Sequence, residues 1–197
     1  MGVSEAMEQT DALKEYMDQV YEKSIFDELQ GSGEVWVYHL HGHQTVAGSV
    51  RINNKYDLVL KTETQERLPI TKHMIKFVHP LKSQDESKKR IKIDKKVRKD
   101  EQGPILNPRK RNHVKNKTLF PLMQDKVGLQ FTTLEGDVVS GIIGEFNRYE
   151  ITLLGKGGAP IVFLRHAVRD VRDKNDKCYL KTAIEEKRVI VRKKSTV

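Results

Sequence analysis

The residues best suited to chemistry occur twice, each time as a tyrosine followed further on by a basic residue and a histidine. The two sets are Tyr56, Lys72 and His73, and Tyr149, Arg165 and His166. A tyrosine ring can stack on a nucleobase for about 1–3 kcal/mol. A cation attracts phosphate, and a neutral imidazole can bond a base edge or a sugar hydroxyl. Each set therefore has the groups needed to hold single-stranded nucleic acid.

Two residues before each tyrosine lies an asparagine, followed by a basic residue, and all four are secondary candidates for nucleic-acid contact: Asn54, Lys55, Asn147 and Arg148. An asparagine amide can contact RNA or simply hold the turn. A strand tyrosine is often only a packing residue, and a strand histidine can be an interface residue instead of a ligand. Because the whole set occurs twice, nucleic-acid contact is favoured over packing.

The two sets lie within a longer repeat that aligns on Gly48 and Gly141. Both copies run from this glycine through an aliphatic residue to the turn asparagine, the basic residue, the tyrosine and an acid, and end in alternating aliphatic residues. A glycine inside a strand marks a bulge or a sharp bend. The pattern predicts five short, bent antiparallel strands per copy. They are expected at 35–40, 45–52, 56–61, 67–70 and 74–78, and at 129–134, 138–146, 149–154, 161–164 and 167–171.

A helix is predicted before each set of strands. Apolar residues recur at three- and four-residue spacing over 4–30, and Gly31 and Gly33 should end that helix. A shorter helix is expected at about 116–126. These elements divide the chain into a first unit with its helix (1–81), a basic and flexible linker (82–117), a second unit (118–172) and a basic tail (173–197). The tail could add one strand at 187–192 or could be disordered.

Charge is distributed unevenly along the chain, which has a net charge of +9. Residues 82–117 contain 14 basic and 5 acidic residues, and residues 172–197 contain 9 and 4, whereas residues 1–34 contain 2 and 9. Clusters of basic charge indicate a polyanionic partner, most often nucleic acid. A solvated linker without any partner is the alternative.

Several classes of function are not supported by the sequence. No apolar run is long enough to span a bilayer, and the acidic beginning lacks a secretory apolar core. The single cysteine, Cys178, suits a reducing, cytoplasmic setting. His39, His41 and His43 alternate but lack a fourth ligand, so no metal is expected. No phosphate-binding loop or catalytic set is present, and we expect neither a cofactor nor an enzymatic activity.

The repeat resembles the Sm-like fold, and within that superfamily it is most similar to the Hfq family. The run Gly141-Ile142-Ile143-Gly144-Glu145-Phe146-Asn147-Arg148-Tyr149-Glu150-Ile151-Thr152-Leu153 matches the first motif of the superfamily. Lys72-His73-Met74-Ile75 and Arg165-His166-Ala167-Val168 match the Lys-His pair of Hfq proteins, where other Sm-like proteins favour Arg-Gly. The resemblance covers roughly 35–80 and 118–172, and implies a mainly β protein with N-terminal helices and two tandem Sm-like small open barrels.

The resemblance also implies a ring, because Sm-like units pair the edges of their fourth and fifth strands. Hfq rings contain six units, so two units per chain imply a homo-oligomer of three chains, a pseudo-hexamer. Two stacked hexameric rings are the competing arrangement. The same resemblance implies that the tyrosine, basic and histidine residues of both sets line the pore face. On the opposite face Hfq stacks adenines, and the matching residue is Tyr38, which could equally be a packing residue.

The sequence thus predicts a tandem Hfq-like protein that holds single-stranded, uridine-rich RNA at a ring pore, in post-transcriptional regulation or as an RNA chaperone. The basic linker and tail would add attraction for phosphate in any sequence. The alternative is a ring-forming structural or interaction protein that has lost base recognition, or that binds DNA or protein.

Overall fold

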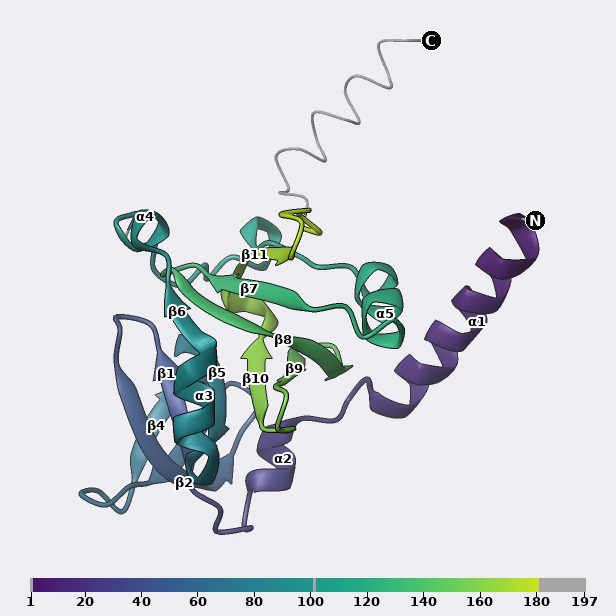
Figure 1. Ribbon diagram of the computed structural model, residues 1–197. Coiled ribbons are helices and arrows are strands. Elements are labelled where there is room, and N and C mark those ends of the chain that lie inside the picture. The colour runs from purple at the N-terminus through teal and green to yellow at the C-terminus, as the bar shows by residue number, and fades with distance from the viewer. Residues whose placement is uncertain (1, 101, 181–197) are drawn as a thin grey trace.

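The computed structural model describes residues 2–100 and 102–180, and the side chains among them from residue 9 onward. The described chain is mainly β, with a helix at its N-terminal end (Figure 1). The helices are α1 (Gly2–Val20), α2 (Ile25–Leu29), α3 (Gln84–Arg90), α4 (Lys95–Arg98) and α5 (Asn116–Gln124). The strands are β1 (Trp36–Leu40), β2 (Thr45–Asn53), β3 (Asp57–Lys61), β4 (Leu68–Thr71), β5 (Ile75–Pro80), β6 (Ile91–Ile93), β7 (Leu129–Thr133), β8 (Asp137–Phe146), β9 (Glu150–Leu154), β10 (Pro160–Leu164) and β11 (Val168–Asp173).

Short 3₁₀ turns complete the described elements: η1 (Lys72–Met74), η2 (Leu81–Ser83), η3 (Pro108–Lys110) and η4 (Arg165–Ala167). The described strands form one 11-stranded antiparallel sheet in the order β11-β7-β8-β9-β10-β5-β1-β2-β3-β4, with β6 paired to β8. We call β1–β5 with α2 the first unit, and β7–β11 with α5 the second unit. Each unit has its fifth strand next to its first, followed by the second, third and fourth, so the repeat in sequence is a repeat in topology.

The long second strand of each unit is bent where the repeated glycine lies. A Cβ at Gly48 would lie 2.7 Å from the Lys61 carbonyl oxygen, and one at Gly141 would lie 2.8 Å from that of Leu154. Real Cβ atoms do not approach backbone that closely, so both strands need glycine at this point. The ladder register also shifts within both strands, as expected for the predicted bends.

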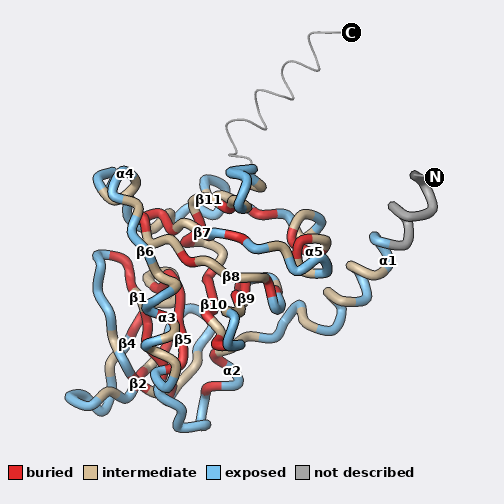
Figure 2. The backbone as a smooth tube through the Cα atoms, viewed as in Figure 1, coloured by how far each residue is buried: buried red, intermediate tan, exposed pale blue. Residues whose placement is uncertain are grey.

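The two units share one sheet, and buried residues lie along strands of both units (Figure 2). Strand β10 of the second unit pairs with β5 of the first, with Val162 opposite Val78 and Phe163 opposite Phe77. The rings of Phe77 and Phe163 stack at 5.1 Å between centroids. Phe77 belongs to the buried cluster of the second unit, whereas Val162 belongs to that of the first. This interdigitation across the β5–β10 pair, which we call the junction, makes independent folding of either unit unfavourable.

The helix predicted over 4–30 is two helices. Helix α1 ends at Val20, and Ser24 begins α2 as its N-cap, accepting a bond from the Phe26 amide at 3.3 Å. The apolar stripe serves two cores: Leu13 and Met17 pack on the second unit, whereas Phe26 lies in the core of the first. One straight helix could not reach both, which is the physical reason for the break.

The described residues of 82–117 form regular elements, whereas their charge predicted a flexible linker. They contain α3, β6, α4 and η3, and β6 adds a strand beside β8. Arg90, at the end of α3, donates to the carbonyl oxygens of Ser140, Leu153 and Ala159 at 3.0, 3.0 and 2.6 Å. A residue counted as basic linker charge therefore fastens this segment to the second unit.

The start of the predicted tail is also ordered. Residues 174–180, which we call the capping segment, turn back along β11, and an isolated antiparallel bridge pairs Cys178 with Arg172. The strand suggested at 187–192 lies outside the described residues.

Candidate nucleic-acid interface

The turn between the second and third strands is built alike in both units and is fastened to the following 3₁₀ turn. The amide of Asn54 donates to the Asp57 carbonyl at 2.9 Å, and the amide of Lys72 donates to the Tyr56 carbonyl at 2.7 Å. In the second unit, Asn147 bonds the Glu150 carbonyl at 3.0 Å and Arg165 bonds that of Tyr149 at 2.8 Å. The structure thus brings each tyrosine next to its basic-histidine turn, although about 16 residues separate them in sequence.

Tyr56 is the more available of the two rings. Its exposed fraction is 66%, and the Lys55 ammonium lies 5.2 Å from the ring centroid. A cation over an aromatic face leaves the other face open and attracts phosphate at the same time. Asn54 is exposed beside it. The first turn thus offers an aromatic surface and a positive charge to solvent.

Tyr149 is 49% exposed and belongs to a stack of three side chains. The Arg148 guanidinium lies 5.2 Å from the Tyr149 ring centroid and 5.4 Å from that of Tyr21, which follows α1. Glu22 forms an ion pair with Arg148 at 3.7 Å. The second aromatic turn is therefore partly covered by residues that follow α1.

Asn147 holds its turn through its side chain. The carboxamide oxygen accepts from the amides of Tyr149 and Glu150 at 2.7 and 2.8 Å, and the nitrogen donates to the Lys23 carbonyl at 2.7 Å. Asn147 therefore holds the turn, which was the alternative to RNA contact, because its side chain takes the place of a backbone group in the turn. Its contact with RNA is thus disfavoured relative to that of the exposed Asn54.

Lys72 lies half-buried near the contact between the units. Its ammonium lies 5.5 Å from the Phe26 ring centroid. Burial lowers its pKa, while the charges of Asp27, Glu150 and Asp57 act in the opposite direction. Glu150 comes from the second unit and is buried, so the basic residue of one unit lies in the field of the other.

Arg165 is covered, in contrast to the expectation that it faces a pore. Its Nη1 donates to the Asn116 side-chain oxygen at 2.9 Å, and its guanidinium lies 5.5 Å from the Phe146 ring centroid. Its Nε and Nη2 are shielded from solvent and have no hydrogen-bond partner among the described residues. Burial lowers its pKa to about 10. Tyr16 of α1 covers this region and bonds both the carbonyl oxygen and the amide of Phe146, at 2.9 and 2.7 Å.

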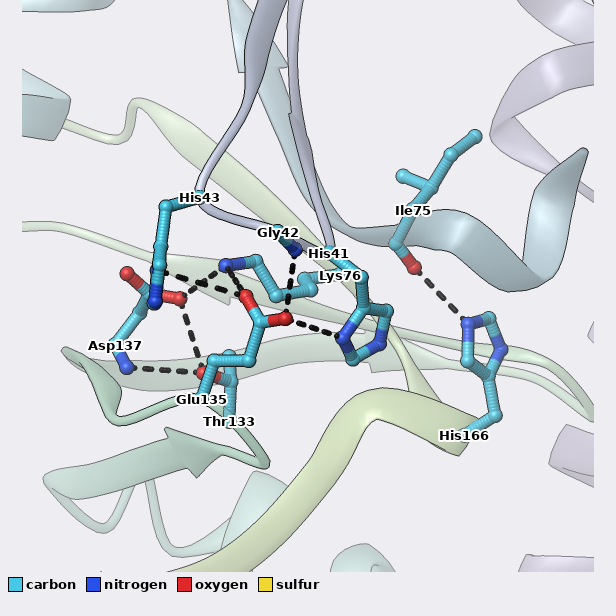
Figure 3. Close-up of polar contacts among 9 residues, drawn as sticks. All are labelled: His41, Gly42, His43, Ile75, Lys76, Thr133, Glu135, Asp137 and His166. Carbon is cyan, nitrogen blue, oxygen red and sulfur yellow. Dashed lines mark hydrogen bonds and ion pairs between the residues drawn. The ribbon is translucent and has the colours of Figure 1, made fainter. Parts of the chain in front are cut away.

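His166 braces the junction. Its Nε2 lies 3.0 Å from the Ile75 carbonyl oxygen of the first unit, and burial lowers its pKa to about 4 (Figure 3). A neutral imidazole that donates to this carbonyl has one nitrogen committed to the protein. His73, its counterpart, is half-buried at the matching place in the first unit.

Tyr38 cannot serve as an adenine-stacking residue in this conformation. Its exposed fraction is 0%, its ring stacks near Phe26 at 6.5 Å between centroids, and burial raises its pKa. A buried ring cannot stack on a base, so the prediction of adenine stacking at Tyr38 is wrong. Tyr38 is a packing residue of β1, which was the alternative reading of the sequence.

A buried charged cluster at the junction was not found from the sequence (Figure 3). The Lys76 ammonium lies 2.7 Å from both Glu135 and Asp137, and Glu135 also accepts from the Gly42 amide at 2.7 Å and lies 3.1 Å from His41 Nδ1. Burial alone would raise the pKa of Glu135, but the bonds from Lys76, Gly42 and His41 bring it down to about 2. These partners lie 59 and 94 residues apart in sequence, so no local pattern could have revealed them.

The histidines at 39, 41 and 43 have separate roles. His39 stacks on Phe77 at 4.2 Å, whereas His41 and His43 approach Glu135. Within residues 2–100 and 102–180, no group of three or more His, Cys, Asp or Glu side chains is placed to hold a metal ion. Of the helices in that same part of the chain, none combines the length and apolar character that a bilayer span needs.

Comparison with known proteins gives one kind of likeness. No family model and no curated protein matches the chain. Among solved structures, it is similar to the crystal structure of the pleiotropic translational regulator Hfq, with 19% sequence identity over 32% of this chain and 92% of that chain, at a TM-score of 0.29. At this score the likeness carries no functional inference, and the geometry of the two turns has to support any proposal.

Proposed function

We propose that this chain is a tandem Sm-like RNA-binding protein of the Hfq type, which holds single-stranded, uridine-rich RNA and catalyses no reaction. The proposal places it in the cytoplasm, in post-transcriptional regulation or RNA chaperoning. The observation that supports it best is the repeated turn, because each unit fastens an exposed tyrosine to a basic-histidine turn by a backbone bond. Packing alone does not require an exposed aromatic ring at the same place in both units, yet Tyr56 is 66% exposed and Tyr149 is 49% exposed.

The first unit supplies the better base site. A uracil stacks on the open face of Tyr56, Lys55 and Lys72 attract the neighbouring phosphates, and His73 bonds the base edge or the 2′-hydroxyl. Lys72 lies half-buried against Phe26, which fixes its stem and directs its charge. Stacking supplies affinity for any base, and the histidine supplies the preference for uracil.

The second unit contributes differently. Tyr149 stacks bases with Arg148 as its cation, because Arg165 is bonded to Asn116 and His166 to Ile75. We therefore propose Tyr149 and Arg148 as RNA contacts in this unit, with Arg165 and His166 in supporting positions.

The basic segment adds attraction for phosphate although it is ordered. Lysines on α3, β6 and α4, and the one that follows α4, remain exposed: Lys88, Lys89, Lys92, Lys95, Lys96 and Lys99. Contacts of this kind weaken steeply as salt is raised. They strengthen binding to any single strand and do not select uracil.

The test is the affinity of the full chain for a fluorescent uridine oligomer, measured by anisotropy. We expect the double variant Tyr56→Ala with Tyr149→Ala to weaken binding at least 10-fold, since stacking is worth about 1–3 kcal/mol per base. The matched control is Tyr56→Phe with Tyr149→Phe, which keeps both rings and should keep affinity. Unchanged affinity in the alanine variant would contradict the proposal.

A second candidate is a structural or interaction protein that kept the fold and lost base recognition. The specific observation in its favour is the second unit, where Arg165 is covered and His166 is used at the junction. That candidate predicts that any binding of a uridine oligomer is through phosphate alone, so it is lost as salt is raised and does not change in the variant Tyr56→Ala with Tyr149→Ala.

A further inference from the structure

The sheet ends in two strands that correspond to the strands paired at the junction. The terminal strands of the described sheet are β4 and β11. Strand β4 is the fourth strand of the first unit and matches β10, whereas β11 is the fifth strand of the second unit and matches β5. Pairing of β4 from one chain with β11 from another would therefore repeat the junction between chains, and three chains would close the proposed ring.

The residue at the centre of the β11 edge can be identified from the junction. The Leu81 amide bonds the Val35 carbonyl. Because strand residues alternate in direction, Val78 then points its backbone toward β10. Counted from the basic residue of each 3₁₀ turn, Val171 takes the place of Val78. A second chain would need the backbone of Val171 in order to pair with β11.

That backbone is already occupied by the chain itself. The Val171 carbonyl accepts from the Tyr179 amide at 2.8 Å, and the Val171 amide donates to the Asp170 carboxylate at 2.9 Å. The next outward residue, Asp173, donates its amide to the Lys177 carbonyl at 3.2 Å. On the other side of Val171, the Asn112 side chain donates to the Arg169 carbonyl at 3.3 Å. The edge that would close a ring is thus capped.

We propose that the β11 edge is a docking surface for β4 of a second copy of this chain, and that the capping segment must leave before the two copies can pair. The inference rests on the ring that belongs to the proposed function. In the capped state the protein is a single chain whose two units form one part of the ring. Both tyrosine turns remain accessible to RNA in that state.

The cap is built from several contacts. The Asp173 carboxylate accepts from the amides of Asn175 and Lys177 at 2.8 and 3.1 Å and from the Tyr179 hydroxyl at 2.8 Å. Leu180, which is 5% exposed, joins the buried cluster of the second unit. The turn held by Asp173 precedes Tyr179 and the buried Leu180 follows it. Together they hold the Tyr179 amide against the Val171 carbonyl.

The opposite edge is weakened for pairing as well. The Lys72 amide bonds the Tyr56 carbonyl, so Ile70 faces β3 and Pro69 faces the open edge. Pro69 takes the place that Val162 has in β10. Proline has no amide hydrogen to donate, and proline on an edge strand is a known device against unwanted pairing. A contact between chains would therefore have one hydrogen bond fewer than the junction, which favours the cap in the competition.

The experiment is the solution mass from size exclusion with light scattering. The full chain and a truncation that ends at Leu180 should both have the mass of one chain. A truncation that ends at Asp173, combined with Pro69→Val, should have the mass of three chains. The truncation at Leu180 is the matched control, because it removes residues 181–197 and keeps the cap.

A full chain with the mass of three, or an uncapped variant that is folded by circular dichroism and still single, would overturn the proposal. If the truncation at Asp173 does not fold, two full-length variants test the proposal instead. They are Tyr179→Pro and Tyr179→Ala, each combined with Pro69→Val. Proline removes the amide that Val171 accepts, whereas alanine keeps it. The proline variant should therefore show a larger share of trimer than the alanine variant, and equal shares would contradict the cap.

Binding of the uridine oligomer by the same samples separates the two proposals. Oligomer binding with masses that do not change would leave the RNA proposal standing and overturn the cap. If the masses change as expected but the uridine oligomer does not bind, the cap stands and the RNA proposal is overturned.

Discussion

At the residue scale, the same kind of side chain has opposite roles depending on what surrounds it. Arg90 and Lys89 are neighbours on α3 in a run of basic residues. Arg90 is half-buried and bonds three carbonyl groups, whereas Lys89 is exposed. Composition treats both as free positive charge, and only the position of the second unit under α3 tells them apart.

Replacing Arg90 should therefore destabilise the protein. Arg90→Ala leaves three carbonyl groups without their charged donor, and we expect the free energy of unfolding to fall by about 2–3 kcal/mol. Lys89→Ala, one residue earlier, should change it by less than about 0.5 kcal/mol. Urea denaturation followed by circular dichroism measures both. Equal effects of the two variants would show that the Arg90 contacts do not stabilise the fold.

The tyrosines were the most predictable part of the site. Their exposure follows from their place at a two-strand turn, which the repeat defines by itself. The basic-histidine pair could be placed next to them but its orientation could not be foreseen. Arg165 is covered because Tyr16, far away in sequence, bonds the backbone of Phe146.

At the element scale, the strands and the helix at about 116–126 were predicted well, whereas the helix at 4–30 and the connector were predicted poorly. The bent strands can be predicted from Gly48, Gly141 and the alternation of apolar and polar residues around them, because these are local signals. The break after Val20 depends on which core each half of the apolar stripe reaches, and β6 depends on the free edge offered by β8. Both are set by tertiary contacts, so residue pattern alone predicts a longer helix and a disordered linker.

Two buried histidines, one on β1 and one on η4, also set a pH dependence. Burial lowers the pKa of His39 and of His166 to about 4, from an ordinary 6.5. The folded protein therefore binds fewer protons than the unfolded chain below pH 6.5, so this stability is complete above pH 6.5 and is lost as pH falls toward 4. Glu135, with a pKa of about 2, acts in the same direction between its ordinary 4.5 and 2.

We expect the free energy of unfolding to fall by about 1 kcal/mol per histidine between pH 7.5 and 5.5. Denaturant titrations at the two pH values measure this. His166→Gln keeps a donor for the Ile75 carbonyl and cannot titrate, so it should reduce the loss by about 1 kcal/mol. A wild-type protein whose stability is the same at both pH values would contradict the burial of these imidazoles.

At the scale of the whole molecule, the two units are one folded body. Their cores exchange Phe77 and Val162, and the ion pair between Lys76 and Glu135 joins the first unit to the second. The sequence predicted two similar units and paired fourth and fifth strands, because both follow from the repeat and from the resemblance it carries. The pseudo-hexamer implied one such pair inside each chain, whereas stacked rings did not, and the choice depends on how residues 82–117 lead from β5 to β7.

The proposed function separates two contributions to RNA binding. It assigns base contact to the turns at Tyr56 and Tyr149, and attraction for phosphate to the exposed lysines of the segment from α3 to the end of α4. Affinity alone mixes the two contributions, so a measurement that reports position is the more direct test.

That measurement is photocrosslinking of the full chain to a 4-thiouridine oligomer at moderate salt, with the crosslinked residues mapped by mass spectrometry. Thiouridine reacts from the base, so it marks residues that touch the base. We expect crosslinks at Tyr56 and its neighbours Lys55 and His73, and weaker ones at Tyr149. Crosslinks confined to residues 88–99, or absent altogether, would contradict base recognition at the repeated turns.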